Sequence, residues 1–425
     1  MTSDAQARKL IFSNRLSFLA AGFSIAAWAP MIPYVKDRFS LDEHTLGLLL
    51  LCVGIGSFVA MPLNGYFTSK FGCRGPIYLA AIAAAACIGA IPFTYNLYVM
   101  AFILFVMGIA AITIDVVSNV NAALVEEVTE RNIMSGLHGL YSVGGLLGSL
   151  SVTFLLSIKF DLTLVGCMAA VFILLLVVAG CKHLITNVHI GKSVEQATRS
   201  EQEADSKLAQ GEQNASGQRE NCEQELSHGQ QSSTLKYYTH PTVLLIGIMC
   251  LIMFMTEASM LDWSGVFLHS QRGLALEHAG YGYAAFAVMM TICRLTGDKV
   301  VSKFGRGKVI IIGTMFIMAG FIVAVMIPHY SAAFLGFALI GVGASNVVPQ
   351  LVSITARIKE VPTHISVTIV NTIGFTGILI GPALIGFLAH AITLPYTYLC
   401  QALSVLFVTV MSVILIKLSK DKAKD

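Results

Sequence analysis

The tetrapeptide Ser69-Lys70-Phe71-Gly72 recurs as Ser302-Lys303-Phe304-Gly305, 233 residues further along the chain. Other landmarks keep this offset and the same place in their own series of apolar segments: Gly108 and Gly341, Glu127-Val128 and Glu360-Val361, Gly144 and Gly377, Gly148 and Gly381. An offset shared by several landmarks indicates an internal duplication, because one chance match would not preserve the spacing. The chain therefore contains two copies of one structural unit.

The composition places most of this chain in lipid. Charged residues make up 12% of it, against about 25% in an ordinary soluble domain, and the mean hydropathy is +0.75. The net charge of +3 is spread over short loops without a basic stripe, which gives no reason to expect a nucleic-acid partner. We therefore expect an integral membrane protein whose surroundings are a lipid bilayer.

A spanning helix needs about 20 mostly apolar residues, and the chain offers twelve such segments. They lie near 14–35, 45–68, 76–94, 97–125, 134–157, 162–186, 241–269, 279–301, 308–328, 331–357, 364–391 and 395–418. The predicted fold is all-α, with two pseudo-symmetric six-helix bundles at 1–186 and 237–425. Residues 187–236 join them; they are rich in Glu, Gln and Ser and contain no Phe, Tyr or Trp. Such a composition predicts a flexible cytoplasmic linker.

Lysine and arginine set the expected direction of the spans. With both termini in the cytoplasm, all but five of the 27 basic residues fall in cytoplasmic segments. The exceptions are Lys36, Arg38, Lys159 and Arg272 in outer loops and Arg294 within a helix. This bias predicts a bacterial inner-membrane protein with both termini inside.

Ionisable residues inside a membrane are costly, so they are candidates for function. Asp115 is the strongest, because Ser118 and Asn119 follow it at i+3 and i+4 and form one polar stripe on the helix. Burial favours the neutral form of a carboxylate, so such a group can exchange a proton near neutral pH. A permanent ion pair with a base on a neighbouring helix is the structural alternative.

Glu257 and Asp262 are two further proton-coupling candidates. Their spacing of five places them about 140° apart on a helix, so we expect at most one to line a central cavity deeply. Trp263 adjoins Asp262, and Trp28 has nearly the same place in the first repeat. The two tryptophans could bind a solute or anchor the protein at the membrane interface.

Several polar side chains are candidates for solute contact or for hydrogen bonds between helices. They are Asn119, His138, Tyr141, Asn346, Gln350 and Asn371. Arg294 and Asp298 are spaced i, i+4, which favours an intrahelical pair over a gating role. The patterns Gly144-x-x-x-Gly148 and Gly377-x-x-x-Gly381 permit close helix contact, and we expect them to pack across the interface between the halves.

The chain carries no signature of a known enzyme, metal site or cofactor site. It has no Walker loop, HExxH motif or nucleophile elbow. We therefore expect no enzyme activity, cofactor or metal ion, and any uphill work must draw on an ion gradient or on the solute's own gradient.

The repeat and the loops that carry it resemble the major facilitator superfamily. The family's G-x-x-x-D-R-x-G-R-R loop appears as Gly65 to Arg74, with Ser69 in place of the acid and Cys73 in place of an arginine. A second copy runs from Asp298 to Arg306. The resemblance implies a cytoplasmic gating role for Gly65, Lys70, Gly72, Arg74, Asp298, Lys303 and Gly305, whereas gating by Arg294 is the alternative to its pairing with Asp298.

Within that superfamily the chain is similar to fucose permease-like and YbjJ-type bacterial inner-membrane proteins. The likeness rests on His138 to Gly144, Glu257-Ala258-Ser259, Asp262-Trp263, Gly343-Ala344-Ser345 and the Asp115-x-x-x-Asn119 pattern. It implies that Asp115 contacts sugar or couples transport to protons. Those proteins have a second acid in the first helix, and 25–33 contain none here, so fucose specificity does not carry over.

The sequence therefore predicts a monomeric secondary transporter for a small polar, sugar-like solute, working by alternating access and driven by protons or sodium. An exporter of amphipathic, drug-like or siderophore-like compounds is one alternative. A transporter-fold receptor that senses a solute and signals through a partner is another.

Overall fold

The computed structural model describes residues 4–131, 133–186, 239–355, 358 and 360–421. The predicted linker at 187–236 lies outside these residues. The regular elements of the described part are all helices. The N-terminal half contains α1 (Asp4–Ala26), α2 (Ile32–Arg38), α3 (Glu43–Phe71), α4 (Arg74–Ala90), α5 (Leu97–Thr129), α6 (Met134–Ser157) and α7 (Leu162–Gly180).

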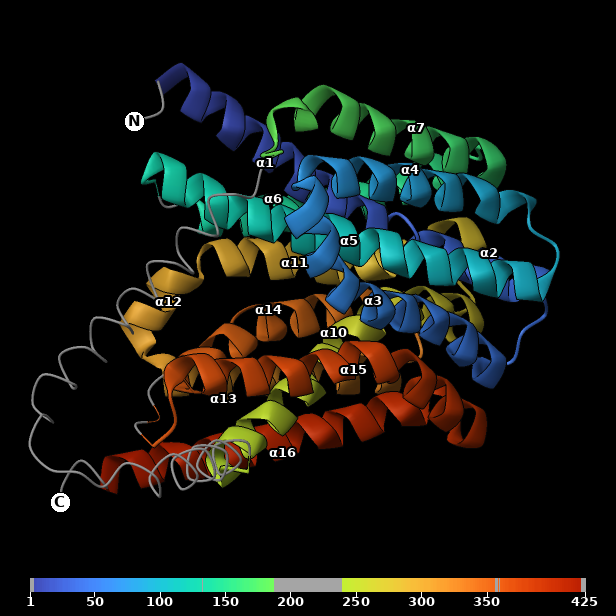
Figure 1. Cartoon of the computed structure of the whole chain (residues 1–425). Coiled ribbons are helices and arrows are strands. Elements are labelled where there is room, and N and C mark those ends of the chain that lie inside the picture. Colours follow the sequence, from blue (N-terminus) through green and yellow to red (C-terminus); the bar gives the residue numbers. More distant parts are fainter. Residues whose placement is uncertain (1–3, 132, 187–238, 356–357, 359, 422–425) are drawn as a thin grey trace, which may run out of the picture.

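The C-terminal half contains the remaining α-helices of the described part. They are α10 (Pro241–Arg272), α11 (Tyr281–Leu295), α12 (Gly297–Phe304), α13 (Arg306–Met326), α14 (Tyr330–Thr355), α15 (Thr363–Ile392) and α16 (Leu394–Asp421). In Figure 1 the two halves form two layers, and α1 begins at the end of the bundle where α16 ends. We call this the terminal end and the opposite one the far end. The prediction of an all-α membrane fold is confirmed.

Eleven helices of the described part are long and apolar enough to cross a membrane. The predicted span at 279–301 differs, because it is divided into α11 and α12 at Thr296. The first span is also interrupted: α1 ends at Ala26, and a short 3-10 turn with Pro30 leads into α2. Proline cannot donate the backbone hydrogen bond that a continuous helix needs, and this break places Trp28 at an irregular point of the chain.

The duplication is visible in backbone packing. A Cβ atom at Gly108 of α5 would overlap the carbonyl oxygen of Val53, and one at Gly341 of α14 would overlap that of Phe286. Both members of this second contact lie 233 residues after their counterparts. Glycine is required at both positions because the helix backbones approach too closely for any side chain.

The repeated loop motif ends two helices in the same way. Gly72 (φ 71°) follows α3 and Gly305 (φ 80°) follows α12, and positive φ is a conformation that glycine adopts without strain. The amide of Gly72 donates to the carbonyl oxygen of Thr68, and that of Gly305 donates to Val301. Thus the sequence repeat is also a repeat of helix-capping geometry.

The glycine pairs of α6 and α15 do not pack across the interface between the halves, which corrects the prediction. Gly144 lies against the backbone of Leu19 in α1, and Gly377 lies against Leu251 in α10. Each small face therefore packs within its own half. Contacts between the halves come from other faces, where α15 meets α3 and α11 meets α6.

The far end joins the halves through polar contacts. An ion pair between Lys159 and Glu277 lies there, together with two histidine–carboxylate contacts, His269 with Asp37 and His390 with Asp42. Ser157 and Tyr281 add a hydrogen bond of 3.2 Å. Between Gly47 and Gly386 the backbones approach closely enough to exclude a side chain. The two halves are therefore in direct contact at the far end.

Candidate functional site: a cavity between the halves

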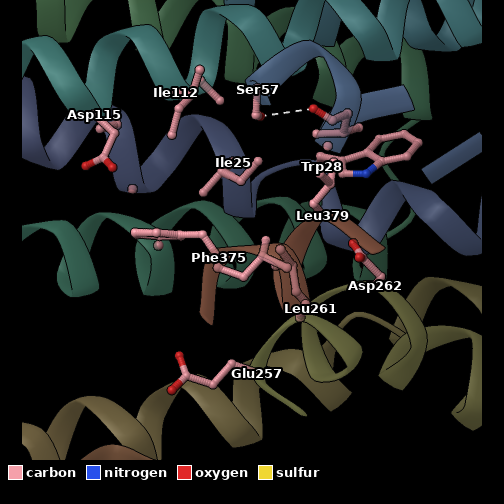
Figure 2. Close-up of a pocket in the computed structure, with 18 of the residues that line it drawn as sticks. Ile25, Trp28, Ser57, Ile112, Asp115, Glu257, Leu261, Asp262, Phe375 and Leu379 are labelled. Carbon is pink, nitrogen blue, oxygen red and sulfur yellow. Dashed lines mark hydrogen bonds between the residues drawn. The ribbon is translucent and has the colours of Figure 1, made fainter. Parts of the chain in front are cut away.

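A cavity of about 440 Å³ lies between the two halves. Helices α1, α3, α5 and α6 line it from the N-terminal half, and α10, α11 and α15 line it from the C-terminal half. This size falls in the usual range for small-molecule sites, roughly 300–1,000 Å³. Figure 2 shows carboxyl groups from both halves around it.

Asp115 of α5 lines this cavity. Its carboxylate accepts a hydrogen bond of 3.2 Å from the side-chain amide of Asn119, which also donates to the Asp115 carbonyl oxygen at 2.9 Å. The predicted polar residues Asp115 and Asn119 thus form hydrogen bonds with each other within one helix. Among the described residues Asp115 has no ion-pair partner, so the alternative of a permanent ion pair finds no support there.

Glu257 of α10 faces a cation. Its carboxylate oxygen lies 3.8 Å from a guanidinium nitrogen of Arg294, which also donates from Nε to the carbonyl oxygen of Ser345 at 3.3 Å. Arg294 therefore links α10, α11 and α14 at the cavity wall. The side chain of Asp298 lies outside the described residues, so its predicted pairing with Arg294 is not tested.

Asp262 also lines the cavity, together with Glu257. The expectation that at most one of them would do so is wrong, because the cavity extends along α10 and meets both faces at different levels (Figure 2). Asp262 makes no hydrogen bond or ion pair with a described residue. Three acids and one arginine thus line one cavity.

The two tryptophans differ in position. Trp28 is 1% exposed and lines the cavity, whereas Trp263 is fully buried and is not a lining residue. Neither indole nitrogen has a hydrogen-bond partner among the described residues. The burial of both side chains removes the interpretation of interfacial anchors, since an anchor must reach the headgroup region.

Among the other predicted solute ligands, Tyr141 lines the cavity. The rest are not lining residues, and their role in binding stays a prediction. Asn119 is bonded to Asp115, and Asn346 donates to the carbonyl oxygen of Cys293 at 3.1 Å. His138 lies edge-on to Phe18, with 5.5 Å between ring centres. Gln350 is buried within α14, and Asn371 lies on α15 next to the lining residue Thr372.

Sequence reasoning missed several polar lining residues: Ser57, Ser142, Tyr283, Thr291, Thr372 and Thr376. Ser57 Oγ lies 3.0 Å from the carbonyl oxygen of Val53 and 3.1 Å from that of Gly108. Thr372 and Thr376 share a face of α15 through i, i+4 spacing. That spacing was a readable signal, but hydroxyl groups are common in membrane helices and are individually uninformative.

The loop motif lies at the end of α3 and of α12. Lys70 lies 5.4 Å from the ring centre of Phe71, and Lys303 lies 5.4 Å from that of Phe304, which repeats the contact at the common offset. Arg74 lies 5.6 Å from the ring centre of Tyr78. A Cβ atom at Gly65 would meet no other group within 4 Å. The cytoplasmic gating role of these residues stays a prediction.

Outside the spans, acidic groups at the far end are held in their charged form. The Lys159 ammonium beside Glu277 lowers the pKa of that carboxyl. Hydrogen bonds from Thr45 lower the pKa of Asp42, which caps the N-terminus of α3. Both acids contact the opposite half across the far end, Glu277 through Lys159 and Asp42 through His390.

The chain belongs to the Major Facilitator Superfamily, whose family model matches residues 16–361. It is 38% identical to an uncharacterised MFS-type transporter of Yersinia pestis over 93% of each chain. It is 28% identical to the membrane protein MosC of Rhizobium meliloti over 89% of this chain and 83% of that one. The chain is thus a membrane-spanning transporter of this superfamily.

Solved structures share its fold at low identity. A nucleoside transporter NupG variant superposes with a TM-score of 0.71 at 14% identity, over 96% of this chain and 99% of that one. A bacterial homologue of the human lysosomal transporter Spinster gives a TM-score of 0.69 at 13% identity, over 98% and 99%. These likenesses define the architecture alone.

Proposed function

We propose that this protein is a proton-coupled secondary transporter that moves a small polar solute by alternating access between its two halves. The observation that carries the proposal is the placement of Asp115 in the central cavity without a described cation beside it. A carboxyl group in such a site can lose and regain a proton as its surroundings change. A permanently paired acid would lack this freedom.

The contacts between the halves support the alternating part of the proposal. One ion pair, two histidine–carboxylate contacts and a hydrogen bond join the halves at the far end, and rigid-body rocking of one half against the other would have to break them. The structure is then one of two states, with the solute path leading to the terminal end. The opposite state would open the far end.

The proposal includes the direction of the spans and the kind of membrane. The excess of Lys and Arg in loops at the terminal end supports a cytoplasmic location for that end in a bacterial inner membrane. The finer likeness to fucose permease-like carriers stays a prediction. The effect of a protonophore on accumulation distinguishes protons from sodium as the coupling ion.

A second candidate function is export of amphipathic compounds. The wall of the cavity favours it, because apolar side chains from both halves, including Ile112, Phe286 and Phe375, lie between the few polar groups. Apolar walls with a few charged groups suit molecules that have an apolar body. Sensitivity of a deletion strain to such compounds would support export.

Flux through the purified protein in lipid vesicles tests the proposal. A panel of sugars, nucleosides, amino acids and organic acids is first screened by thermal shift, and stabilising compounds are then followed across a pH gradient. The proposal predicts accumulation that collapses when a protonophore is added. Accumulation that persists with the protonophore and needs sodium would contradict proton coupling, and facilitated equilibration without accumulation would contradict active transport.

A further inference from the structure

The charge of the cavity wall is unbalanced. Asp115, Glu257 and Asp262 face a cavity in which Arg294 is the one lysine or arginine among the lining residues. Arg294 is engaged by Glu257 at 3.8 Å. Buried charges are normally paired, since an isolated one loses its hydration without compensation. The wall therefore lacks a positive partner for the remaining acids.

Away from Glu257 and Arg294, the cavity wall has two further residues with unused polar groups, Asp262 and Trp28. Asp262 has no hydrogen bond or ion pair with a described residue, and the indole N–H of Trp28, in a side chain that is 1% exposed, has no acceptor among the described residues. The two residues come from opposite halves, and Figure 2 shows them on the same side of the cavity in this view. One group needs a donor and the other an acceptor.

Buried polar groups are almost always satisfied, and those left over in a site are the usual places for ligand contacts. A carboxylate takes a positively charged donor best, because charge-assisted hydrogen bonds are roughly twice as strong as neutral ones. The indole N–H is a donor only, so it requires an oxygen or nitrogen lone pair. An ammonium group alone has no lone pair and cannot satisfy it.

We propose that the cavity selects an amine-bearing hydroxylated solute, whose ammonium group binds Asp262 and whose hydroxyl oxygen accepts the hydrogen bond of Trp28. The inference rests on the proposed transport function and names the class of its solute. Because the two residues belong to different halves, the solute bridges the halves when it binds. Asp115, hydrogen-bonded to Asn119, is left to carry the proton.

Three probes of similar ring size separate the two contacts: glucosamine, glucose and cyclohexylamine. Glucose keeps the hydroxyl groups without the charge, and cyclohexylamine keeps the charge without the hydroxyl groups. Binding to the purified full-length protein is measured by calorimetry at neutral pH. We expect glucosamine to bind about tenfold or more tightly than either control, since a site with unused polar groups rejects ligands that leave them unpaired.

Two variants assign the contacts. Asp262→Asn should remove the preference for glucosamine over glucose. Trp28→Phe should remove the preference for glucosamine over cyclohexylamine and should retain the preference for glucosamine over glucose. Glu127→Gln, at an exposed acid of α5 outside the cavity, should bind all three probes as the wild type does. Far-ultraviolet circular dichroism and size exclusion confirm that each variant is folded.

The outcomes separate this inference from the proposed function. If glucose or another neutral solute binds as tightly as glucosamine and is accumulated across a pH gradient, the inference is overturned while proton-coupled transport stands. Failure of every amine to bind would overturn the inference as well. If glucosamine binds with the expected preference but no solute is ever moved by a proton gradient, the site is supported and the transport proposal fails.

Discussion

The two halves of the molecule agree in their backbone packing and differ in their charge. Gly108 against Val53 recurs as Gly341 against Phe286. The charged lining residues have no such counterparts. At the offset of 233 residues, Asp115 corresponds to Val348, Glu257 to Ser24, Asp262 to Ala29 and Arg294 to Met61.

This contrast separates what the duplication provides from what it does not. Close helix contacts and loop geometry are needed in both halves, because each six-helix unit must pack by itself and move as a body. A charged side chain within the membrane is energetically costly. We therefore expect each charged residue only in the half in which it has a function. The cavity is symmetric in its scaffold and asymmetric in its chemistry.

The largest effect is expected at Asp115. Asp115→Asn keeps the hydrogen-bonding size of the side chain and removes its proton exchange, so uphill accumulation should fall to the level of empty vesicles. Exchange of solute across equal concentrations should continue, because it needs no proton movement. The measurement is paired uptake and exchange in vesicles, with Glu127→Gln as control. Wild-type accumulation by the variant would remove Asp115 from the coupling mechanism.

The shared scaffold should fail in the same way in both halves. Gly108→Val and Gly341→Val each force a side chain into a carbonyl oxygen, and overpacking of this kind costs about 1–3 kcal/mol or more. Both variants should show a lowered Tm and reduced yield. Gly136→Ala, where a Cβ atom meets nothing within 4 Å, is the control. Loss of stability in one half only would contradict the equivalence of the two contacts.

The pair of Glu257 and Arg294 has no equivalent in the first half, so its two members should depend on each other. Glu257→Gln and Arg294→Gln should each lower transport, and the double variant should lower it less than the sum of both effects. Arg294 is partly exposed, so we expect a coupling of about 1 kcal/mol. A double-mutant cycle on solute affinity measures it. Full additivity would show that the two groups act separately.

The smallest effect is expected at the far end, where His269 links the halves. Its Nδ1 lies 2.9 Å from the carbonyl oxygen of Leu274 and its Nε2 lies 3.0 Å from the Asp37 carboxylate. The His269 ring therefore connects the end of α10 to the N-terminal half through Asp37. Removing this contact should make opening of the far end easier.

Spin labels at Tyr95 and Tyr330, at the far end of the two halves, report this opening as a longer distance. A partly exposed contact of this kind contributes about 1 kcal/mol or less, so the population of the open state should rise up to about fivefold in His269→Ala. His329→Ala, at the far end of one half only, should leave the distances unchanged. Unchanged distances in His269→Ala would show that this contact does not hold the far end closed.

Much of the fold could be predicted from the sequence, because apolar length and a repeated offset are properties of the chain itself. The broken first span and the division at Thr296 could not, since proline and glycine in a membrane helix are often tolerated. The partners of the glycine faces were predicted wrongly for a related reason. Gly144 and Gly377 indicate a close contact without specifying the helix that makes it.

At the site, rarity was the useful signal: acids in apolar helices led to Asp115, Glu257 and Asp262, and all three line the cavity. Amides such as Asn346 misled, because hydrogen bonds between helices and bonds to a solute use the same groups. The meeting of Glu257 with Arg294 depends on the packing of α10 against α11, which no local pattern encodes. Distances between side chains on different helices can be known only once the fold is known.

The central claim is that Asp115 exchanges a proton during the transport cycle. The most direct test adds a solute that is known to bind to the purified protein in weakly buffered detergent solution. A pH-sensitive dye then reports any protons that are released or taken up. We predict a solute-dependent proton signal that reaches one proton per binding site in the wild type and vanishes in Asp115→Asn, which still binds the solute. A signal of the same size in that variant would contradict the claim.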